Sequence, residues 1–171
     1  QDDFFSVVRF WSASIEEKDP YTRGHCQRVA EYACLIGERA GISQQEMVWF
    51  RMGAFLHDVG KMAVPESILL KRGELTDAER TIIERHTING DELLSSIPFP
   101  WDVRPMVRSH HERWDGSGYP DALSGEDIPL TARILRLADV FDALTTKRSY
   151  RRPLAPTEAR DVMRSDHTAF D

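Results

Sequence analysis

The stretch Gly53-Ala-Phe-Leu-His57-Asp58-Val-Gly60-Lys61 places a histidine and an aspartate side by side at the end of an apolar helical run. Neighbouring imidazole and carboxylate groups can bind one cation, or two cations with the carboxylate bridging them. We expect Gly60 to end the helix and Lys61 to hold a positive charge close to an anion at the same site. Because such a pair also occurs by chance in solvent-exposed positions, its meaning depends on what the rest of the chain supplies.

The composition is that of one globular domain. Of the 171 residues, 41% are hydrophobic and 29% are charged, which is ordinary for a chain of this length. Charges interrupt every apolar run before about 18 residues, so we expect no membrane span. The chain begins at Gln1 with no pattern of a secretory signal, and the missing initiator methionine suggests a fragment of a longer protein.

Charge and cysteine usage argue against a nucleic-acid-binding protein and against a disulfide within the chain. A net charge of -6 argues against a nucleic-acid polymer as partner, although a small anionic ligand needs only local basic groups. Cys26 and Cys34 lie on one expected helix at a separation of about 12 Å, too far for a disulfide. We therefore expect free thiols and a cytoplasmic protein.

Apolar periodicity and capping signals predict an all-α, single-domain bundle of six or seven helices and no strand. Ser43 and Thr76 each begin a capping box. The segment Trp114 to Pro129 holds three glycines and two prolines, which predicts a long and functional loop. The expected helices cover residues 3–18, 22–40, 43–58, 76–94 with a kink or stop at Asn89-Gly90, 102–111, 130–144 and 156–164.

The helix expected at 130–144 is apolar on nearly all sides, which is typical of a buried helix. Asp139 and Asp142 interrupt it. Buried carboxylates need a metal, a cation or strong hydrogen bonds. At the other end of the chain, Phe4, Phe5, Phe10 and Trp11 give the first helix more apolar surface than one face needs, which suggests a homodimer or a missing neighbour.

Five histidines fall on expected helices or helix ends and, with two aspartates, make a candidate ligand set for two metals. One arrangement gives the first metal His25, His57, Asp58 and Asp139, and the second His86, His110 and His111, with Asp58 bridging. Two such ions suit in-line displacement at phosphorus, and the ligand types favour iron, manganese, zinc or nickel. Taken singly, each residue has a simpler explanation: the paired histidines could stabilise a helix C-terminus, Asp139 could pair with Arg133 or Arg136, and Lys61 could be solvated.

Several motifs in order resemble the HD-GYP domain, a branch of the HD phosphohydrolases that degrades cyclic di-GMP. They cover most of the chain: Asp19-Pro-Tyr-Thr-Arg-Gly-His25, His57-Asp-Val-Gly-Lys61, His86, His110-His-Glu-Arg-Trp-Asp-Gly-Ser-Gly-Tyr-Pro120, Ile128-Pro129 and Asp139-Val-Phe-Asp-Ala-Leu-Thr-Thr-Lys-Arg-Ser-Tyr150.

The resemblance implies the ligand set above, with iron as the first choice of metal and manganese as the next. It also implies that Lys61, Asp142, Arg148 and Arg151 surround the bound dinucleotide. Within Gly118-Tyr119-Pro120, the Tyr119 ring could stack on a guanine or contact a GGDEF-domain protein, or the segment could be a structural turn with the ring packed inward.

The chain departs from the family pattern in two places. Some relatives place a glutamate four residues before the first ligand histidine for a third metal, and this chain has Tyr21 there. We therefore expect two metals. Relatives also continue beyond Asp171, so we expect a truncated C-terminus, and a helix over residues 1–18 that continues from a sensor or receiver domain.

The resulting hypothesis is hydrolysis of cyclic di-GMP to pGpG by a metal-bridging hydroxide, with Asp58 and Lys61 as catalytic residues; whether a second cut gives GMP stays open. Two alternatives stay open. Another HD-type nucleotide phosphohydrolase would share His25, His57, Asp58 and Asp139 but would not need the other histidines. A non-catalytic module that binds a cyclic dinucleotide or a GGDEF domain would not need a metal pair.

Overall fold

The computed structural model describes residues 2–19, 23–99, 101–147 and 152–170, and helices and loops account for all of these ranges, without a strand. This confirms the expected all-α fold. None of the described helices combines the length and apolarity needed to cross a bilayer. The elements are α1 (Asp2–Lys18), α2 (His25–Arg39), α3 (Gln44–Leu56), the 3₁₀ turn η2 (Val59–Ala63), α4 (Glu66–Leu69), α5 (Asp77–Glu84), α6 (His86–Leu94), α7 (Arg104–Ser109), the 3₁₀ turn η3 (Gly125–Asp127), α8 (Leu130–Thr145) and α9 (Pro156–Ser165).

Local sequence signals set several helix starts. The Ser43 and Thr76 side chains each accept the backbone N–H of the glutamate three residues later, and that glutamate accepts the cap residue's own N–H. Both capping boxes are therefore confirmed. The Asp102 carboxylate accepts the Arg104 N–H at 3.1 Å where α7 begins.

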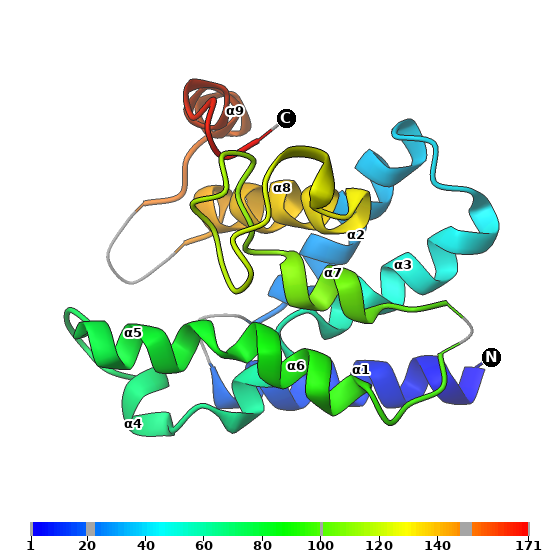
Figure 1. The fold of residues 1–171 in the computed structure, drawn as a ribbon, viewed down its shortest axis with the longest axis horizontal. Coiled ribbons are helices and arrows are strands. Elements are labelled where there is room, and N and C mark those ends of the chain that lie inside the picture. The colour runs from blue at the N-terminus through cyan, green and yellow to red at the C-terminus, as the bar shows by residue number, and fades with distance from the viewer. Residues whose placement is uncertain (1, 20–22, 100, 148–151, 171) are drawn as a thin grey trace.

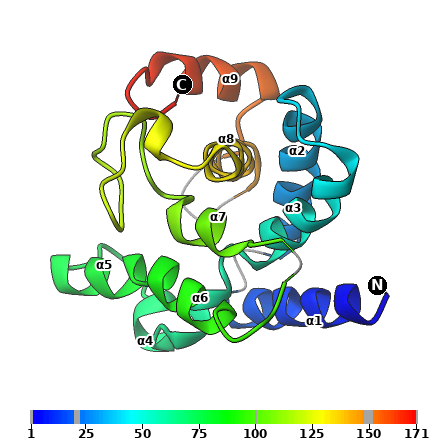
Figure 2. The same cartoon turned by 45° about the vertical axis from the view of Figure 1, so that its right-hand side comes forward.

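Helix α8 is the axis of the molecule. Figure 2 looks almost along it and shows α9, α2, α3, α7 and the long loop arranged around it. Its Ala132, Leu135 and Ala138 side chains are fully buried, and they join α2, α3 and α7 in one hydrophobic core. The expected buried helix at 130–144 is thus found within one residue of its predicted end. Its small and branched side chains let several helices approach it closely.

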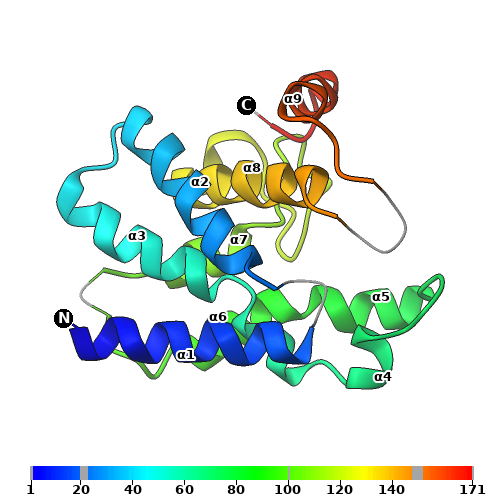
Figure 3. The same cartoon turned by 180° about the vertical axis from the view of Figure 1, so that it is seen from behind.

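A second layer lies beneath this ring. Figures 1 and 3 show α1, α4, α5 and α6 below α7 and α8, with α5 and α6 end to end. Helix α6 packs against η2 and α7, and α1 packs against α3 and η2. The metal-binding candidates from η2, α6 and α7 therefore meet where the two layers touch.

Two glycines have a role other than the one expected. Helix α3 ends at Leu56 with His57 as its C-cap, so the prediction that Gly60 ends it is wrong. Gly60 lies inside η2, and a Cβ there would collide with the His86 carbonyl oxygen. A Cβ at Gly90 would lie 3.0 Å from Val107. The kink or stop expected at Asn89-Gly90 is absent, because both residues lie within α6, and the helix instead breaks at Arg85 between α5 and α6. Both glycines permit close packing of α6.

Candidate metal centre

Three of the candidate histidines follow the last turn of a helix. His57 caps α3, His110 caps α7, and His86 comes two residues after the end of α5. Carbonyl groups in the last turn of a helix lack partners within the helix. Each of these histidines uses such a carbonyl three residues earlier: Nδ1 lies 2.7 Å from Ala54 O, 2.8 Å from Ile83 O and 2.7 Å from Val107 O, respectively.

These contacts fix the protonation of each ring. A carbonyl oxygen only accepts, so Nδ1 of His57, His86 and His110 must carry the proton and donate it. The other nitrogen, Nε2, then presents a lone pair. The tautomer that a metal ligand requires is therefore set by the backbone before any ion binds.

His25 is oriented differently, because its partner is a carboxylate. It is the first residue of α2, and its Nδ1 donates to Asp142 Oδ2 at 2.8 Å. The Arg28 guanidinium donates to the same carboxylate at 2.6 and 3.1 Å. Asp142 is 1% exposed and bonded through both oxygens, so its geometry favours orienting His25 over the substrate contact implied by the resemblance.

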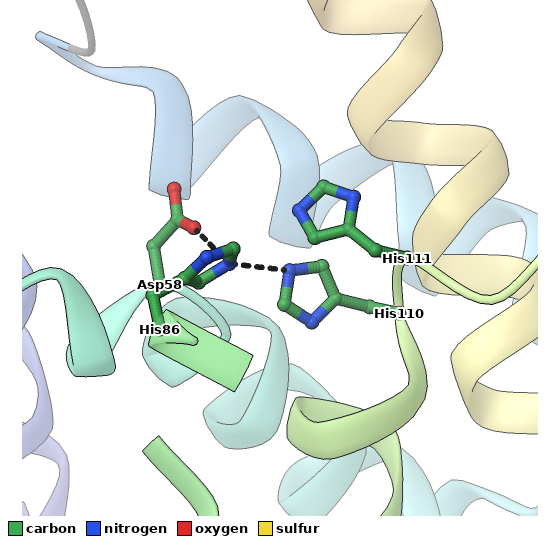
Figure 4. Close-up of side chains that lie close together, drawn as sticks. All are labelled: Asp58, His86, His110 and His111. Carbon is green, nitrogen blue, oxygen red and sulfur yellow. Dashed lines mark hydrogen bonds and ion pairs between the residues drawn. The ribbon is translucent and has the colours of Figure 1, made fainter. Parts of the chain in front are cut away.

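The candidate ligand atoms converge in two groups that share one residue. Within each group one ligand atom per residue lies within 4.8 Å of the others: Asp58, His86, His110 and His111 form one, and His25, His57 and Asp58 the other. Figure 4 shows the first group pointing toward a common centre, with contacts from Asp58 to His86 and from His86 to His110. The structure thus brings six of the seven predicted ligands together around Asp58.

Asp139 stands at the edge of this arrangement. Its Oδ1 lies 3.3 Å from His25 Nε2 and does not belong to either tight group. It extends the His25 group, in which Asp58 Oδ2 lies 4.0 Å from the same nitrogen. The Asp139 charge also acts on the Arg136 guanidinium and raises its pKa against the larger effect of burial.

Two features of the site fit a bound cation. His57 Nε2 is buried and has no hydrogen-bond partner in the described structure, which costs free energy unless something accepts its lone pair. His86 Nε2 and His110 Nε2 lie 3.4 Å apart, and neither has a proton to give because both Nδ1 atoms carry one. A cation between the imidazoles and the carboxylate would relieve both conflicts, and this donor set suits a transition metal.

Electrostatics distinguish the two groups. Burial alone would lower the pKa of His25, but hydrogen bonds to Asp139 and Asp142 outweigh it and raise that pKa to about 9. Burial, together with the neighbouring His86, lowers the pKa of His111 to about 3. Burial would raise the pKa of Asp58, yet Lys61 and the surrounding histidines hold it well below its usual range. One group thus attracts a proton and the other repels it.

Lys61 adds a positive charge beside the shared carboxylate. Its Nζ donates to Asp58 Oδ2 at 2.7 Å. Burial would lower its pKa, but the Asp58 charge raises it above the usual value. Lys61 is therefore a permanent cation next to both groups, which excludes the solvated lysine considered from the sequence.

The Gly/Pro-rich loop covers the histidine-rich group. The Tyr119 ring stacks on His111 with 4.9 Å between ring centroids, and its backbone N–H donates to the His111 carbonyl at 3.4 Å. Burial raises the pKa of the Tyr119 hydroxyl. One face of the ring is thus taken by a candidate ligand, as in the inward-packed alternative.

The loop is held from inside by a residue that the sequence gave no reason to single out. Glu112 is 1% exposed and accepts the N–H groups of Asp121 and Leu123 at 2.7 and 3.1 Å. A Cβ at Gly118 would collide with the Arg113 amide, so the loop folds back tightly on Glu112. Other expected residues, Tyr21, Arg148 and Arg151, lie outside the described part of the chain.

Comparison with known proteins identifies a family and several relatives. A family model described as an HD domain matches residues 9–171. The chain is 39% identical over 167 residues to the 3′3′-cGAMP-specific phosphodiesterase 3 of Vibrio cholerae, covering 96% of this chain and 36% of that protein. It is 46% identical over 140 residues to the cyclic di-GMP phosphodiesterase response regulator RpfG of Xanthomonas campestris, covering 81% and 37%. The chain therefore spans less than two fifths of these curated relatives.

Solved structures agree. A cyclic GMP-AMP-specific phosphodiesterase of Vibrio cholerae superimposes with a TM-score of 0.61 at 32% identity, covering 100% of this chain and 39% of that one. A HDG"Y"P protein from Bdellovibrio bacteriovorus gives a TM-score of 0.69 at 20% identity over 86% of this chain and 47% of that one, which shows a shared fold. The resemblance to HD-GYP proteins indicated by the motifs is confirmed, and the chain belongs to the HD domain family.

Proposed function

We propose that this chain is a metal-dependent phosphodiesterase that hydrolyses a 3′,5′-phosphodiester of cyclic di-GMP. The observation that carries the proposal is the sharing of Asp58 between two convergent ligand groups. A pair of metals bridged by one carboxylate can lower the pKa of a bound water and stabilise the attacking and leaving oxygens of an in-line displacement. The relatives named as cyclic di-GMP and cGAMP phosphodiesterases support this substrate class.

The chain's own residues would have distinct tasks. His57, His86 and His110 present Nε2 lone pairs, because their Nδ1 protons are held by backbone carbonyls. Lys61, 2.7 Å from the shared carboxylate, would stabilise negative charge that develops on the phosphoryl oxygens. A preorganised charge in such a site is worth about 10²–10³ in rate.

The occupancy follows from the same geometry. We infer two transition-metal ions per chain, iron first and manganese next, one at His25, His57 and Asp58 with Asp139 beside them, and the other at Asp58, His86, His110 and His111. The orphaned His57 Nε2 supports an ion in the first group. The opposed nitrogens of His86 and His110 support one in the second.

The deciding experiment is anaerobic purification followed by elemental analysis and chromatography of cyclic di-GMP after incubation with the protein. About two transition metals per chain and the appearance of linear pGpG, followed by GMP if a second cut occurs, are the expected results. A metal-free, folded protein that binds the dinucleotide without cutting it would indicate a binding module. Lys61→Met should keep the metals and lose about a hundredfold in kcat.

A second substrate has its own support. The V. cholerae relative that matches over 96% of this chain is named for 3′3′-cGAMP. The same incubation should therefore include 3′3′-cGAMP at equal concentration. A higher kcat/KM for the hybrid dinucleotide would replace cyclic di-GMP as the proposed substrate while leaving the metal centre unchanged.

We also propose two protein partners, a GGDEF domain and a second copy of this chain. Tyr119 is half-buried against His111, so the Gly118-Tyr119-Pro120 segment would present its backbone and the outer ring face to a GGDEF domain. Phe10 is 70% exposed on α1, which supports a homodimer through that helix, although the side chains of Phe4 and Phe5 lie outside the description. The free thiols of Cys26 and Cys34 suit the cytoplasmic location expected for a second-messenger enzyme.

A further inference from the structure

The last turn of α1 binds the backbone on both sides of His25, the first residue of α2. The Glu16 carboxylate accepts the N–H of Gly24 at 2.7 Å through Oε2 and the N–H of Cys26 at 3.1 Å through Oε1. Gly24 is the N-cap of α2, adopts a left-handed conformation with φ 70°, and has no side chain with which to cap the helix. Glu16 therefore caps α2 from another helix, and its charge suits the positive end of the helix dipole.

His25 lies between the two amides that Glu16 holds. Its backbone is thereby fixed on both sides, while its ring is fixed by Asp142. The direction in which His25 Nε2 points thus depends on α1 as well as on α8. Neither contact follows from the candidate ligand motifs.

The same turn of α1 also holds the segment that follows Asp58. Lys18 Nζ donates to the carbonyl oxygens of Met62 at 2.8 Å and Val64 at 2.7 Å, with Lys61 O at 3.4 Å. These carbonyls lie at the end of η2, the turn that contains Lys61 and begins directly after Asp58. Directly before Glu16 on α1, the Ile15 side chain is 1% exposed and packs in the core, so the turn itself is anchored.

We propose that Glu16 and Lys18 are positioning residues that set His25 relative to Asp58 and Lys61. The inference rests on the proposed function in that it takes these groups to bind metals. It adds an asymmetry. Glu16 acts on His25, which belongs to one ligand group, whereas Lys18 acts on the segment of Asp58, which belongs to both. Residues that orient ligands from outside typically change metal affinity by about 10–100-fold.

The test measures metal binding, without catalysis, in metal-free protein titrated with Co²⁺ under anaerobic conditions. Calorimetry gives the two affinities. The Co²⁺ absorption spectrum assigns them, because the band absent in His25→Ala belongs to the His25 site and the band absent in His110→Ala belongs to the other. In Glu16→Ala, the affinity of the His25 site should fall by about tenfold or more, and that of the other site by less than about threefold. Glu16→Gln, which keeps an acceptor oxygen, should lie between Glu16→Ala and the wild type.

Lys18→Met removes the donor and keeps the apolar stem, and it should weaken both sites. Glu17→Ala is the matched control, because Glu17 is exposed in the same turn and should leave both affinities unchanged. If Glu16→Ala does not fold, Glu16→Asp, which is one methylene shorter, replaces it with the same expected asymmetry.

Two results would overturn the inference. One is a Glu16→Ala variant that binds Co²⁺ at both sites with the wild-type affinities. The other is a variant that loses affinity equally at both sites and has a lower Tm. The proposed function fails separately. A wild-type protein that binds two Co²⁺ ions but leaves the cyclic dinucleotides intact contradicts the phosphodiesterase and leaves the positioning role standing.

Discussion

The two halves of the candidate metal centre use the same imidazole ligand in two different settings. In the His25 half, carboxylates surround the ring, Asp142 orients it, and the pKa rises to about 9. In the half with His86, His110 and His111, carbonyls or a tyrosine ring orient the imidazoles, and burial lowers the pKa of all three. The difference between His25 and these three imidazoles teaches that hydrogen-bonded carboxylates, and not the ligand type, decide how strongly a proton competes with a metal.

The largest expected effect comes from the residue that both halves share. Asp58→Ala should lower kcat at least about a thousandfold, because it removes a charged group from both metals at once. Elemental analysis should find fewer than one metal per chain. Asp127→Ala, in the exposed turn η3, serves as control. A variant that retains two metals and its activity would break the comparison, since the halves would then be independent.

A pair of histidine variants should separate the halves. His25→Ala is expected to lose the metal of its own half and His110→Ala that of the other, so each should bind about one metal in place of two and lose hydrolysis. Elemental analysis together with the chromatographic assay checks both. His167→Ala, an exposed histidine beyond α9, should keep both metals. Loss of both metals in either ligand variant would show that neither half forms alone.

A smaller effect is expected from the orienting carboxylate. Asp142→Asn replaces the carboxylate with a neutral amide, which cannot accept charge-assisted hydrogen bonds from both His25 and Arg28. The His25 site should therefore lose about 10–100-fold in metal affinity. The other site should be unchanged, because backbone carbonyls and the Tyr119 ring orient its imidazoles. Calorimetric titration measures both. The exposed Asp161→Asn is the control, and equal weakening of the two sites would contradict the assignment of Asp142 to one half.

The smallest effect is a proton count. At pH 7, His25 with its pKa of about 9 is protonated in the metal-free protein, whereas His111 with its pKa of about 3 is neutral. Metal binding should therefore release about one proton from the His25 half and none from His111, with the release disappearing as pH rises past about 9. Calorimetry in buffers of different ionisation enthalpy measures this release. A signal independent of buffer at pH 7 would contradict it.

The same shifts give a pH dependence of stability in the metal-free protein. The raised pKa of His25 stabilises the fold fully below its ordinary pKa of 6.5, and this contribution is lost as pH rises toward about 9. The lowered pKa of His111 acts in the opposite sense, because its contribution is present above 6.5 and is lost as pH falls toward about 3. A Tm maximum near pH 6.5 is expected in thermal scans.

Much of this fold follows from local sequence. The capping boxes at Ser43 and Thr76, the buried helix α8 and the helix after Pro156 all lie close to where their patterns predicted them. Each depends on residues within one or two turns, so periodicity and capping chemistry suffice. The convergence of the candidate ligands could be predicted for a different reason. Histidines and aspartates at buried or helix-end positions need polar partners, and in this chain they can serve as partners for one another.

The remaining parts depend on contacts between distant segments. Nothing near Glu16 or Lys18 shows that they hold residues 8 and 44 positions away, respectively. Gly60 is needed because the backbone of α6 lies against it, and the residues next to Gly60 in the sequence do not indicate that contact. Asp142 was singled out as a buried carboxylate, but only the placement of α2 against α8 shows that it contacts His25. The metal roles of the seven expected ligands stay predictions.

Asp58 also makes the two halves thermodynamically dependent. An ion in one half changes the charge and the orientation of this carboxylate, so the other half meets an altered ligand. The two affinities are therefore linked, and each occupancy changes the affinity of the other by the same factor. Because hydrolysis needs both ions, activity should depend on free metal concentration more steeply than the filling of either half alone.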